Sequence, residues 1–266
     1  MKVLVLCCLW CGSVGAQFIS PSWRGDSDAE YAAWDMFTEA EFAPNVPDKH
    51  SDAPTSDAAL TCFTGSAFLT SSGNIYSFQS ATSFQIEDSA NFPIENALLQ
   101  ISGLGSGINL ETVRLIANDP EGAPQTFRPA RSFIINKEVL TGERGGEGTS
   151  YAIQWDLSAN PVVGSYAVLF KATESSLSLD KVSLDTSASF QAVLQPQPMR
   201  VRIEPKIDGF TVSWTGRGQL ETSATLSGNW VSVSEGITTT EGVHQLVVSK
   251  PTGRQFFRLT QPSVTE

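Results

Sequence analysis

The chain of 266 residues contains few of the side chains from which catalytic and transition-metal sites are built. It has two histidines, His50 and His244, and they fall in different predicted domains. A Ser-His-Asp triad or a histidine-rich metal site is therefore poorly supplied. The stretch Gly103–Gly107 lacks the spacing of a G-x-S-x-G nucleophile motif, and no phosphate-binding glycine loop occurs. These absences predict a protein that is not an enzyme.

Positive charge is also scarce, with 17 lysines and arginines against 28 aspartates and glutamates and a formal net charge of −11. No basic cluster occurs in the sequence, so nucleic acid and anionic membrane surfaces are excluded as partners on charge. No cofactor is indicated except Ca²⁺, which acidic exported proteins can hold between loop carboxylates. The candidate calcium ligands are Asp119, Glu121, Asp180 and Asp185.

Long apolar runs are missing apart from the one at the start. Lys2, the run Val3–Trp10 and the small-residue site Val14-Gly15-Ala16 predict a signal peptide over residues 1–16 and a secreted, extracellular protein. The run is shorter than the roughly 20 residues that cross a bilayer, so we expect no membrane span after cleavage.

Cysteine becomes scarcer still after this cleavage, which would remove Cys7, Cys8 and Cys11 and leave Cys62 alone. A single cysteine excludes a disulfide within one molecule. Because Cys62 lies in the apolar stretch Leu60–Phe63, we expect it to be a small buried side chain in a strand.

Residues 17–59 are expected to form an N-terminal helix followed by an extended arm. In Asp28–Ala40, Tyr31 and Trp34 are three residues apart, which is a helical spacing. The next stretch, Ala43–Thr55, is rich in proline, aspartate and asparagine, as surface segments are.

Two aromatic residues are candidates for contact with an extracellular polysaccharide or another cell-surface component. Tyr76 and Trp23 lie where exposed side chains are expected. Trp23 has a second interpretation, in which Trp23 and Arg24 pack the arm onto the domain that follows. Both interpretations stay open at the level of sequence.

From residue 60 the chain contains a series of short strands. Apolar and polar residues alternate in Tyr151–Leu157, the pattern of a half-buried strand, and Tyr166–Ala172 is apolar on both faces, which predicts a central strand. The alternation in Leu177–Asp185 changes phase at Asp180-Lys181, which predicts a bulge. Ser71-Ser72-Gly73 predicts a hairpin turn. Further strands are expected at Leu60–Phe63, Ala67–Thr70, Asn74–Phe78, Phe84–Ile86, Ala97–Ser102, Val113–Ala117 and Ser132–Asn136. Residues 60–190 should form an all-β, antiparallel, jelly-roll-like β-sandwich.

A proline-containing segment then separates a second, smaller domain. Gln195-Pro196-Gln197-Pro198 has the composition of an extended spacer and predicts a linker over residues 191–205. Residues 206–262 are expected to form a small β module. Its expected strands are Phe210–Trp214, Gln219–Ser223, Trp230–Ser234, His244–Val248 and Gln255–Leu259.

Several motifs in the first domain resemble those of exported bacterial proteins, many of them uncharacterised, that often carry a PEP-CTERM sorting tail. The matching stretches are Trp23-Arg24-Gly25, Gly73–Phe78, Gln154–Leu157 and Ser178–Asp185. The final stretch Gln261–Glu266 is polar and lacks the apolar anchor of that tail, which favours free secretion. The strand around Asp180 is also similar to the last strand of jelly-roll carbohydrate-binding modules.

The C-terminal module resembles a fibronectin-type-III-like module that is appended to many exported bacterial proteins. The stretches that carry this resemblance are Ser213–Gly216, Leu220-Glu221, Leu226–Trp230 and Phe256–Leu259. The resemblance implies no catalytic activity for the module.

Two functions remain open. The first is a secreted, non-catalytic protein that binds a glycan or matrix component or has a structural role. The second is a carbohydrate-active enzyme, a glycoside hydrolase or polysaccharide lyase, that uses paired carboxylates. Its candidate acids are Asp156, Glu143 and Glu147, for which solvated surface charge is the simpler interpretation.

Overall fold

The computed structural model describes residues 18–51, 56–119, 121–139, 146–195, 200–215, 218–240, 243–249 and 253–260. The predicted signal peptide, with three of the four cysteines, lies outside these residues. The chain divides into two compact units, and the division between Gln195 and Pro196 falls inside the segment expected to be a linker. In the described part of the chain, no helix has the length and apolar character needed to cross a membrane.

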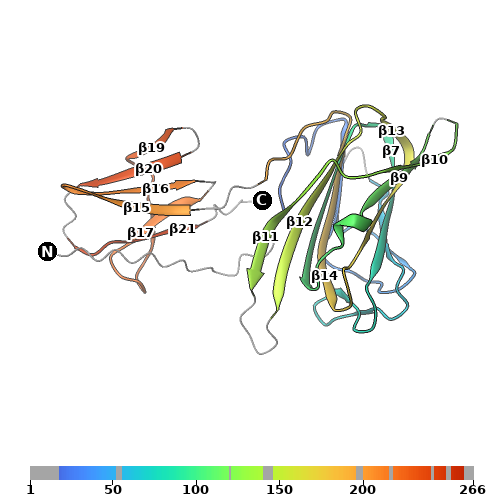
Figure 1. Ribbon diagram of the computed structural model, residues 1–266, viewed down its shortest axis with the longest axis horizontal. Helices are drawn as coiled ribbons and strands as arrows, with labels where there is room; N and C mark the ends of the chain where they lie inside the picture. Colours follow the sequence, from blue (N-terminus) through green and yellow to red (C-terminus); the bar gives the residue numbers. More distant parts are fainter. Residues whose placement is uncertain are drawn as a thin grey trace. The chain divides into compact units, whose positions relative to one another are not determined.

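The larger unit is a sandwich of two antiparallel sheets, which confirms the all-β prediction (Figure 1). Sheet A has eight strands, whose bounds are β1 Ala29–Trp34, β3 Lys49–His50, β5 Phe68–Leu69, β6 Ile75–Tyr76, β8 Asn96–Gly105, β11 Arg131–Val139, β12 Glu147–Asp156 and β14 Leu177–Ser187. Six of them lie in the order β11-β12-β8-β14-β1-β3, and the β5–β6 hairpin joins β14 through β6.

Sheet B has six strands, whose bounds are β2 Pro44–Asn45, β4 Ala59–Cys62, β7 Ser83–Ile94, β9 Arg114–Asn118, β10 Pro124–Phe127 and β13 Val162–Lys171. Their order is β10-β9-β13-β7-β4-β2, so β13 is central, as its apolar sequence predicts. A single 3-10 turn, Leu110–Thr112, precedes β9.

The main core fills the space between the two sheets. Its largest fully buried side chains include Trp34 and Trp155 from sheet A and Phe170 from sheet B. Cys62 is a free, buried thiol of this core, which confirms its predicted place. The predicted hairpin and bulge are confirmed as well, since β5 pairs with β6 and the register of β14 shifts between Leu179 and Lys181.

The prediction of a helix over Asp28–Ala40 is wrong. Ala29–Trp34 is strand β1, paired antiparallel with β14. Ala32 and Trp34 point into the main core, and Ala29 packs on the opposite face of the sheet. A six-residue segment with two aromatic residues three apart fits a helix or a strand, and pairing with a distant strand decides between them. The expected arm likewise contributes β2 and β3 to the two sheets.

The outer face of sheet A is covered by residues 18–28 and 188–195. Trp23 and Val193 pack on Leu98 and Ala152 there in a second apolar cluster. Gln154 of β12 holds the segment 188–195 in place, because its side-chain oxygen accepts a hydrogen bond of 3.0 Å from the backbone N–H of Val193. The central strands of sheet A are therefore buried on both faces, and polar side chains such as Gln100, Gln154 and Asp185 are buried on the covered outer face.

The smaller unit has seven strands in two sheets. The bounds are β15 Arg200–Lys206, β16 Gly209–Thr215, β17 Gln219–Ser223, β18 Val231–Ser232, β19 Ile237–Thr240, β20 Val243–Ser249 and β21 Phe256–Thr260. One sheet has the order β15-β16-β20-β19 and the other β18-β17-β21. Phe210, Val212, Trp214, Leu220 and Phe257 form its core. The sequence pattern missed β15 and β19.

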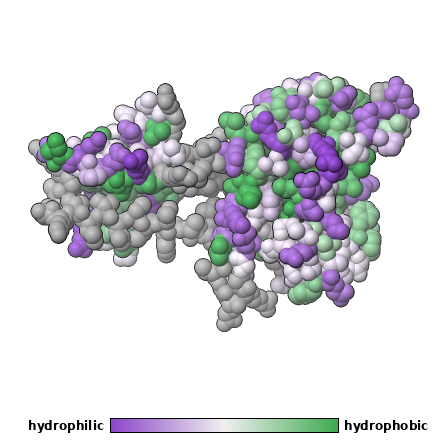
Figure 2. Space-filling view, viewed as in Figure 1, coloured by the Kyte–Doolittle hydropathy of each residue, from purple (hydrophilic) through white to green (hydrophobic). Residues whose placement is uncertain are grey.

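On the face shown in Figure 2, hydrophilic and hydrophobic residues of the larger unit are interspersed. No single apolar area dominates the larger unit on that face.

Candidate functional site

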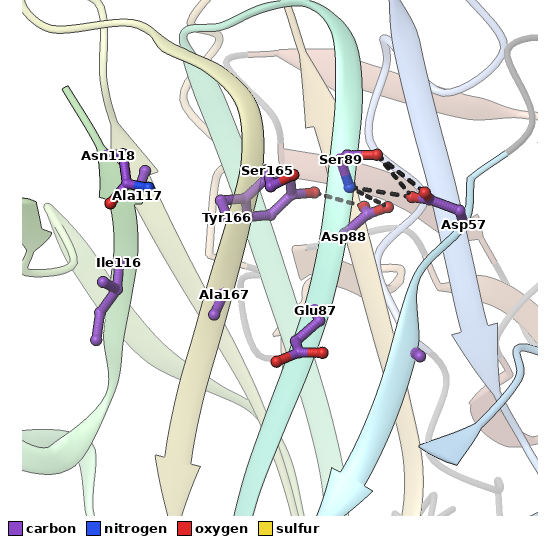
Figure 3. Close-up of a pocket in the computed structure, with 11 residues that line it drawn as sticks. Asp57, Glu87, Asp88, Ser89, Ile116, Ala117, Asn118, Ser165, Tyr166 and Ala167 are labelled. Atoms are coloured by element: carbon purple, nitrogen blue, oxygen red, sulfur yellow. Dashed lines mark hydrogen bonds between the residues drawn. The ribbon is translucent and has the colours of Figure 1, made fainter. Parts of the chain in front are cut away.

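The outer face of sheet B carries a shallow trough of about 450 Å³ that crosses β9, β13, β7 and the start of β4 (Figure 3). We call this the sheet B trough. Two rows of outward side chains line it. The first row consists of Ile116, Ala167, Glu87 and Ala59, which are joined by the strand register. The second row consists of Asn118, Ser165, Ser89 and Asp57.

The dimensions of the sheet B trough follow from strand geometry. Neighbouring strands are about 4.8 Å apart, so four strands span about 14 Å, and alternate residues along a strand place the two rows about 7 Å apart. Between the rows lies the backbone of Ala117, Tyr166 and Asp88, whose side chains point inward. Small side chains such as Ala167 and Ser165 keep the space between the rows open. The trough therefore has room for an extended chain that crosses the strands.

Hydrogen bonds fix the acidic end of the trough. The Ser89 hydroxyl donates to both Asp57 carboxylate oxygens at 3.1 and 2.9 Å, and the Ser89 backbone N–H donates to Oδ1 of Asp57 at 3.0 Å. Partial burial raises the pKa of Asp57, but hydrogen bonds from Asp88 and Ser89 outweigh it and leave that pKa below its ordinary value. Asp57 is therefore an ionised hydrogen-bond acceptor at neutral pH.

A buried polar layer lies directly beneath the trough. The Tyr166 hydroxyl donates to Oδ2 of Asp88 at 2.6 Å (Figure 3). Burial raises the pKa of Asp88 to about 7, against the effect of this hydrogen bond. Burial also raises the pKa of Glu30 to about 7, and the nearby Asp57 carboxylate adds to the shift.

Glu30 is the least satisfied member of this layer. It lies on β1 opposite Thr186, is 3% exposed, and has no hydrogen-bond partner for either carboxyl oxygen among the described residues. It faces the sheet B acids from the other side of the sandwich, because Glu30 shares the inward face of β1 with Ala32 and Trp34. A buried carboxyl without a partner favours its neutral form.

The predicted ligand-binding aromatic residues have different positions. Trp23 is 2% exposed and belongs to the apolar cover of sheet A, so the prediction that it is available to a ligand is wrong. The alternative, packing with Arg24, is the one that the structure shows. The Arg24 guanidinium donates two hydrogen bonds of 2.7 and 2.8 Å to Asp185 and stacks 3.7 Å from the centre of the Tyr31 ring.

Tyr76 is half-buried, and its ring contacts the rings of Phe68 and Phe78. It therefore remains partly accessible from solvent. Neither Tyr76 nor these two phenylalanines lines the sheet B trough.

The predicted calcium ligands are not gathered into one site. Asp185 is fully buried and paired with Arg24; burial raises its pKa to about 6, with Arg24 acting in the opposite direction. Asp180 accepts hydrogen bonds from Asn74 and Ser102 instead. Asp119 accepts one from the backbone of Ala123 within a turn. Glu121 is exposed. Across the described ranges, no three His, Cys, Asp or Glu side chains are arranged to hold a metal ion.

The acids proposed for glycosidic chemistry are far apart. Glu147 and Asp156 are the first and last residues of β12, about 30 Å apart at the rise of a strand. Glu147 pairs with Lys137 at 2.7 Å, and Asp156 accepts a hydrogen bond of 2.6 Å from the Ser158 hydroxyl. These two acids therefore cannot act together on one glycosidic bond. Glu143 lies outside the described residues.

Sequence reasoning missed the sheet B trough and the acids beneath it. Asp88 could have been found, because it continues the inward alternation of Phe84 and Ile86 beyond the end of the expected strand. Glu30 would have followed from reading Ala29–Trp34 as a strand. The trough itself has no local signal, since each row joins residues from four separate segments.

Comparisons with protein-family models, curated proteins and solved structures found no match to this chain. The function must therefore be argued from the site.

Proposed function

We propose that this protein is a secreted, non-catalytic glycan-binding protein whose larger unit holds a neutral polysaccharide chain in the sheet B trough. The observation that carries the proposal is the difference between the two outer sheet faces. Two segments of the chain cover the outer face of sheet A, whereas the outward side chains of sheet B at the trough are half-buried or exposed. An open, rigid sheet face with a polar trough is suited to an extended ligand.

The lining of the trough favours a ligand rich in hydroxyl groups. Asp57 and Glu87 supply acceptors, Asn118 supplies both donors and acceptors, and Ser165 supplies a hydroxyl. The side-chain amide of Gln85 donates to Glu87 at 2.6 Å and holds that carboxylate in place. With two acids in the trough and a net charge of −11, an anionic polysaccharide would be repelled.

The position of the titrating acid supports binding rather than catalysis. Asp88 has the raised pKa that often marks a catalytic acid, but its side chain is only 7% exposed and points inward to Tyr166. A general acid must come within hydrogen-bonding distance of the atom that it protonates. A sugar in the trough would meet the backbone at this position instead.

The proposal is tested by filling the trough. Ala167→Trp places a large ring in the first row of the trough and should weaken retention by a neutral β-glucan, mannan or xylan in affinity electrophoresis. The control is Lys171→Trp, on the same strand and about 13 Å away along it. Equal retention of wild type and Ala167→Trp would refute binding in the trough. Release of reducing ends from the same polysaccharides by the wild type would refute the non-catalytic assignment.

A further inference from the structure

A second exposed feature lies on sheet A at the β5–β6 hairpin. Three aromatic side chains, Phe68, Tyr76 and Phe78, contact one another there, and we call them the aromatic cluster. Phe68 and Phe78 are 39% and 69% exposed, and Tyr76 is half-buried. From the geometry of this cluster we infer a second sugar-binding site, at which one neutral pyranose ring stacks on Phe78.

The rings are held in place before any ligand arrives. Phe68 and Phe78 are stacked, with centroids 5.6 Å apart and ring planes at 26°. Tyr76 meets Phe78 edge-on, with centroids 4.5 Å apart, and meets Phe68 in the same way at 5.6 Å. Fixing three rings against one another removes the rotamer entropy that a ligand would otherwise have to overcome.

The backbone under the cluster is also fixed. Gly73 has a φ of +84° in the turn between the two strands, and the backbone N–H of Thr70 donates to the carbonyl of Asn74 at 2.9 Å. Tyr76 pairs directly with Ser178 of β14, which ties the hairpin to the large sheet.

Polar groups of the kind that bind sugar hydroxyls lie on the strands that hold Tyr76, and Ser178 is the nearest of them. The Asn74 side chain donates to the Ser178 hydroxyl at 3.1 Å and to Oδ1 of Asp180 at 3.4 Å. Since Ser178 is the cross-strand neighbour of Tyr76, their Cβ atoms are about 5 Å apart. The Asp180 carboxylate is half-buried and retains acceptor capacity beyond its long bonds to Asn74 and Ser102.

The size of the cluster favours a single ring over a protein partner. A phenylalanine or tyrosine buries about 150–250 Å² when fully covered, so the exposed parts of Phe68 and Phe78 amount to roughly 200 Å². A stable protein interface needs about 800 Å² from each partner. One sugar ring with its apolar face on Phe78 would cover the available area.

The site is tested with Phe78→Ala on an array of neutral oligosaccharides. We expect Phe78→Ala to weaken binding to at least one glycan series by about tenfold. Phe78→Trp, which retains a ring, should keep the binding, and so should the control Val139→Ala, an exposed apolar residue of β11. Unchanged binding by Phe78→Ala, or no binding of neutral glycans by the wild type, would overturn the inference.

Two further measurements separate this site from the sheet B trough and from self-association. The Ala167→Trp variant should retain binding that depends on Phe78; if Ala167→Trp alone is without effect, only the trough proposal fails. Sedimentation of the wild type and Phe78→Ala should give the same mass. A dimer that dissociates in Phe78→Ala would mean that the cluster contacts a second copy of the chain and would overturn the sugar site.

Discussion

Replacing Glu30 by glutamine should make the protein more stable in mild alkali and reduce its loss of stability as pH rises. Glu30 is 3% exposed and has no described hydrogen-bond partner, so the fold favours its neutral form. Burial raises its pKa from about 4.5 in the unfolded chain to about 7 in the folded protein. Glutamine has nearly the same shape and never ionises.

The sign and size of the effect follow from proton linkage. Between pH 4.5 and pH 7 the folded state holds the Glu30 proton and the unfolded state does not, so the free energy of unfolding falls as pH rises. At 1.36 kcal/mol per pH unit, the pKa difference corresponds to about 3 kcal/mol lost by pH 8. Below pH 4.5 the glutamate is neutral in both states, and the glutamine variant should have nearly wild-type stability.

Urea unfolding at pH 4.5 and at pH 8 measures the difference. We expect Glu30→Gln to gain about 2–3 kcal/mol over the wild type at pH 8 only, which corresponds to a rise in Tm of roughly 4–12 °C. Glu111→Gln, at an exposed position, is the matched control and should leave the free energy of unfolding unchanged at both pH values. If Glu30→Gln has the wild-type dependence on pH, or is less stable than the wild type at pH 8, the reasoning about the buried polar layer is wrong.

Two further predictions concern the larger unit. Arg24→Ala leaves the buried Asp185 carboxylate unpaired and should lower the free energy of unfolding in urea by about 3–5 kcal/mol. Adding Asp185→Asn to the same chain should restore part of this loss. A loss below 1 kcal/mol would contradict the role of this pair in holding the N-terminal segment on sheet A. The Cys62 side chain is 1% exposed, and burial raises the pKa of its thiol. A thiol reagent should therefore modify Cys62 only at the rate at which the protein unfolds. Rapid modification of the native protein would show that β4 opens locally.

The all-β architecture could be predicted because local patterns record which faces of a strand are buried. The alternation in Tyr151–Leu157 and the phase change at Asp180-Lys181 correspond to β12 and to the register shift in β14. The turn at Ser71-Ser72-Gly73 needs a positive φ, which Gly73 provides.

Other features depend on contacts between distant segments and have no local signal. Ala29–Trp34 becomes a strand because β14 pairs with it, and Trp23 is buried because sheet A needs a cover on its outer face. Glu30 and Asp88 point inward because the alternation of their strands requires it. The secreted location and the resemblance to exported bacterial proteins stay predictions.

The central claim, that the sheet B trough binds a neutral glycan, is tested most directly by amide chemical shifts of the labelled protein during titration with a neutral polysaccharide that it retains. The account predicts saturable shifts at Ser89, Ser165 and Asn118, which line the trough on three adjacent strands. Ala152 and Leu98, under the cover of sheet A, should not move. Saturable shifts that leave all three trough residues unchanged would contradict the claim.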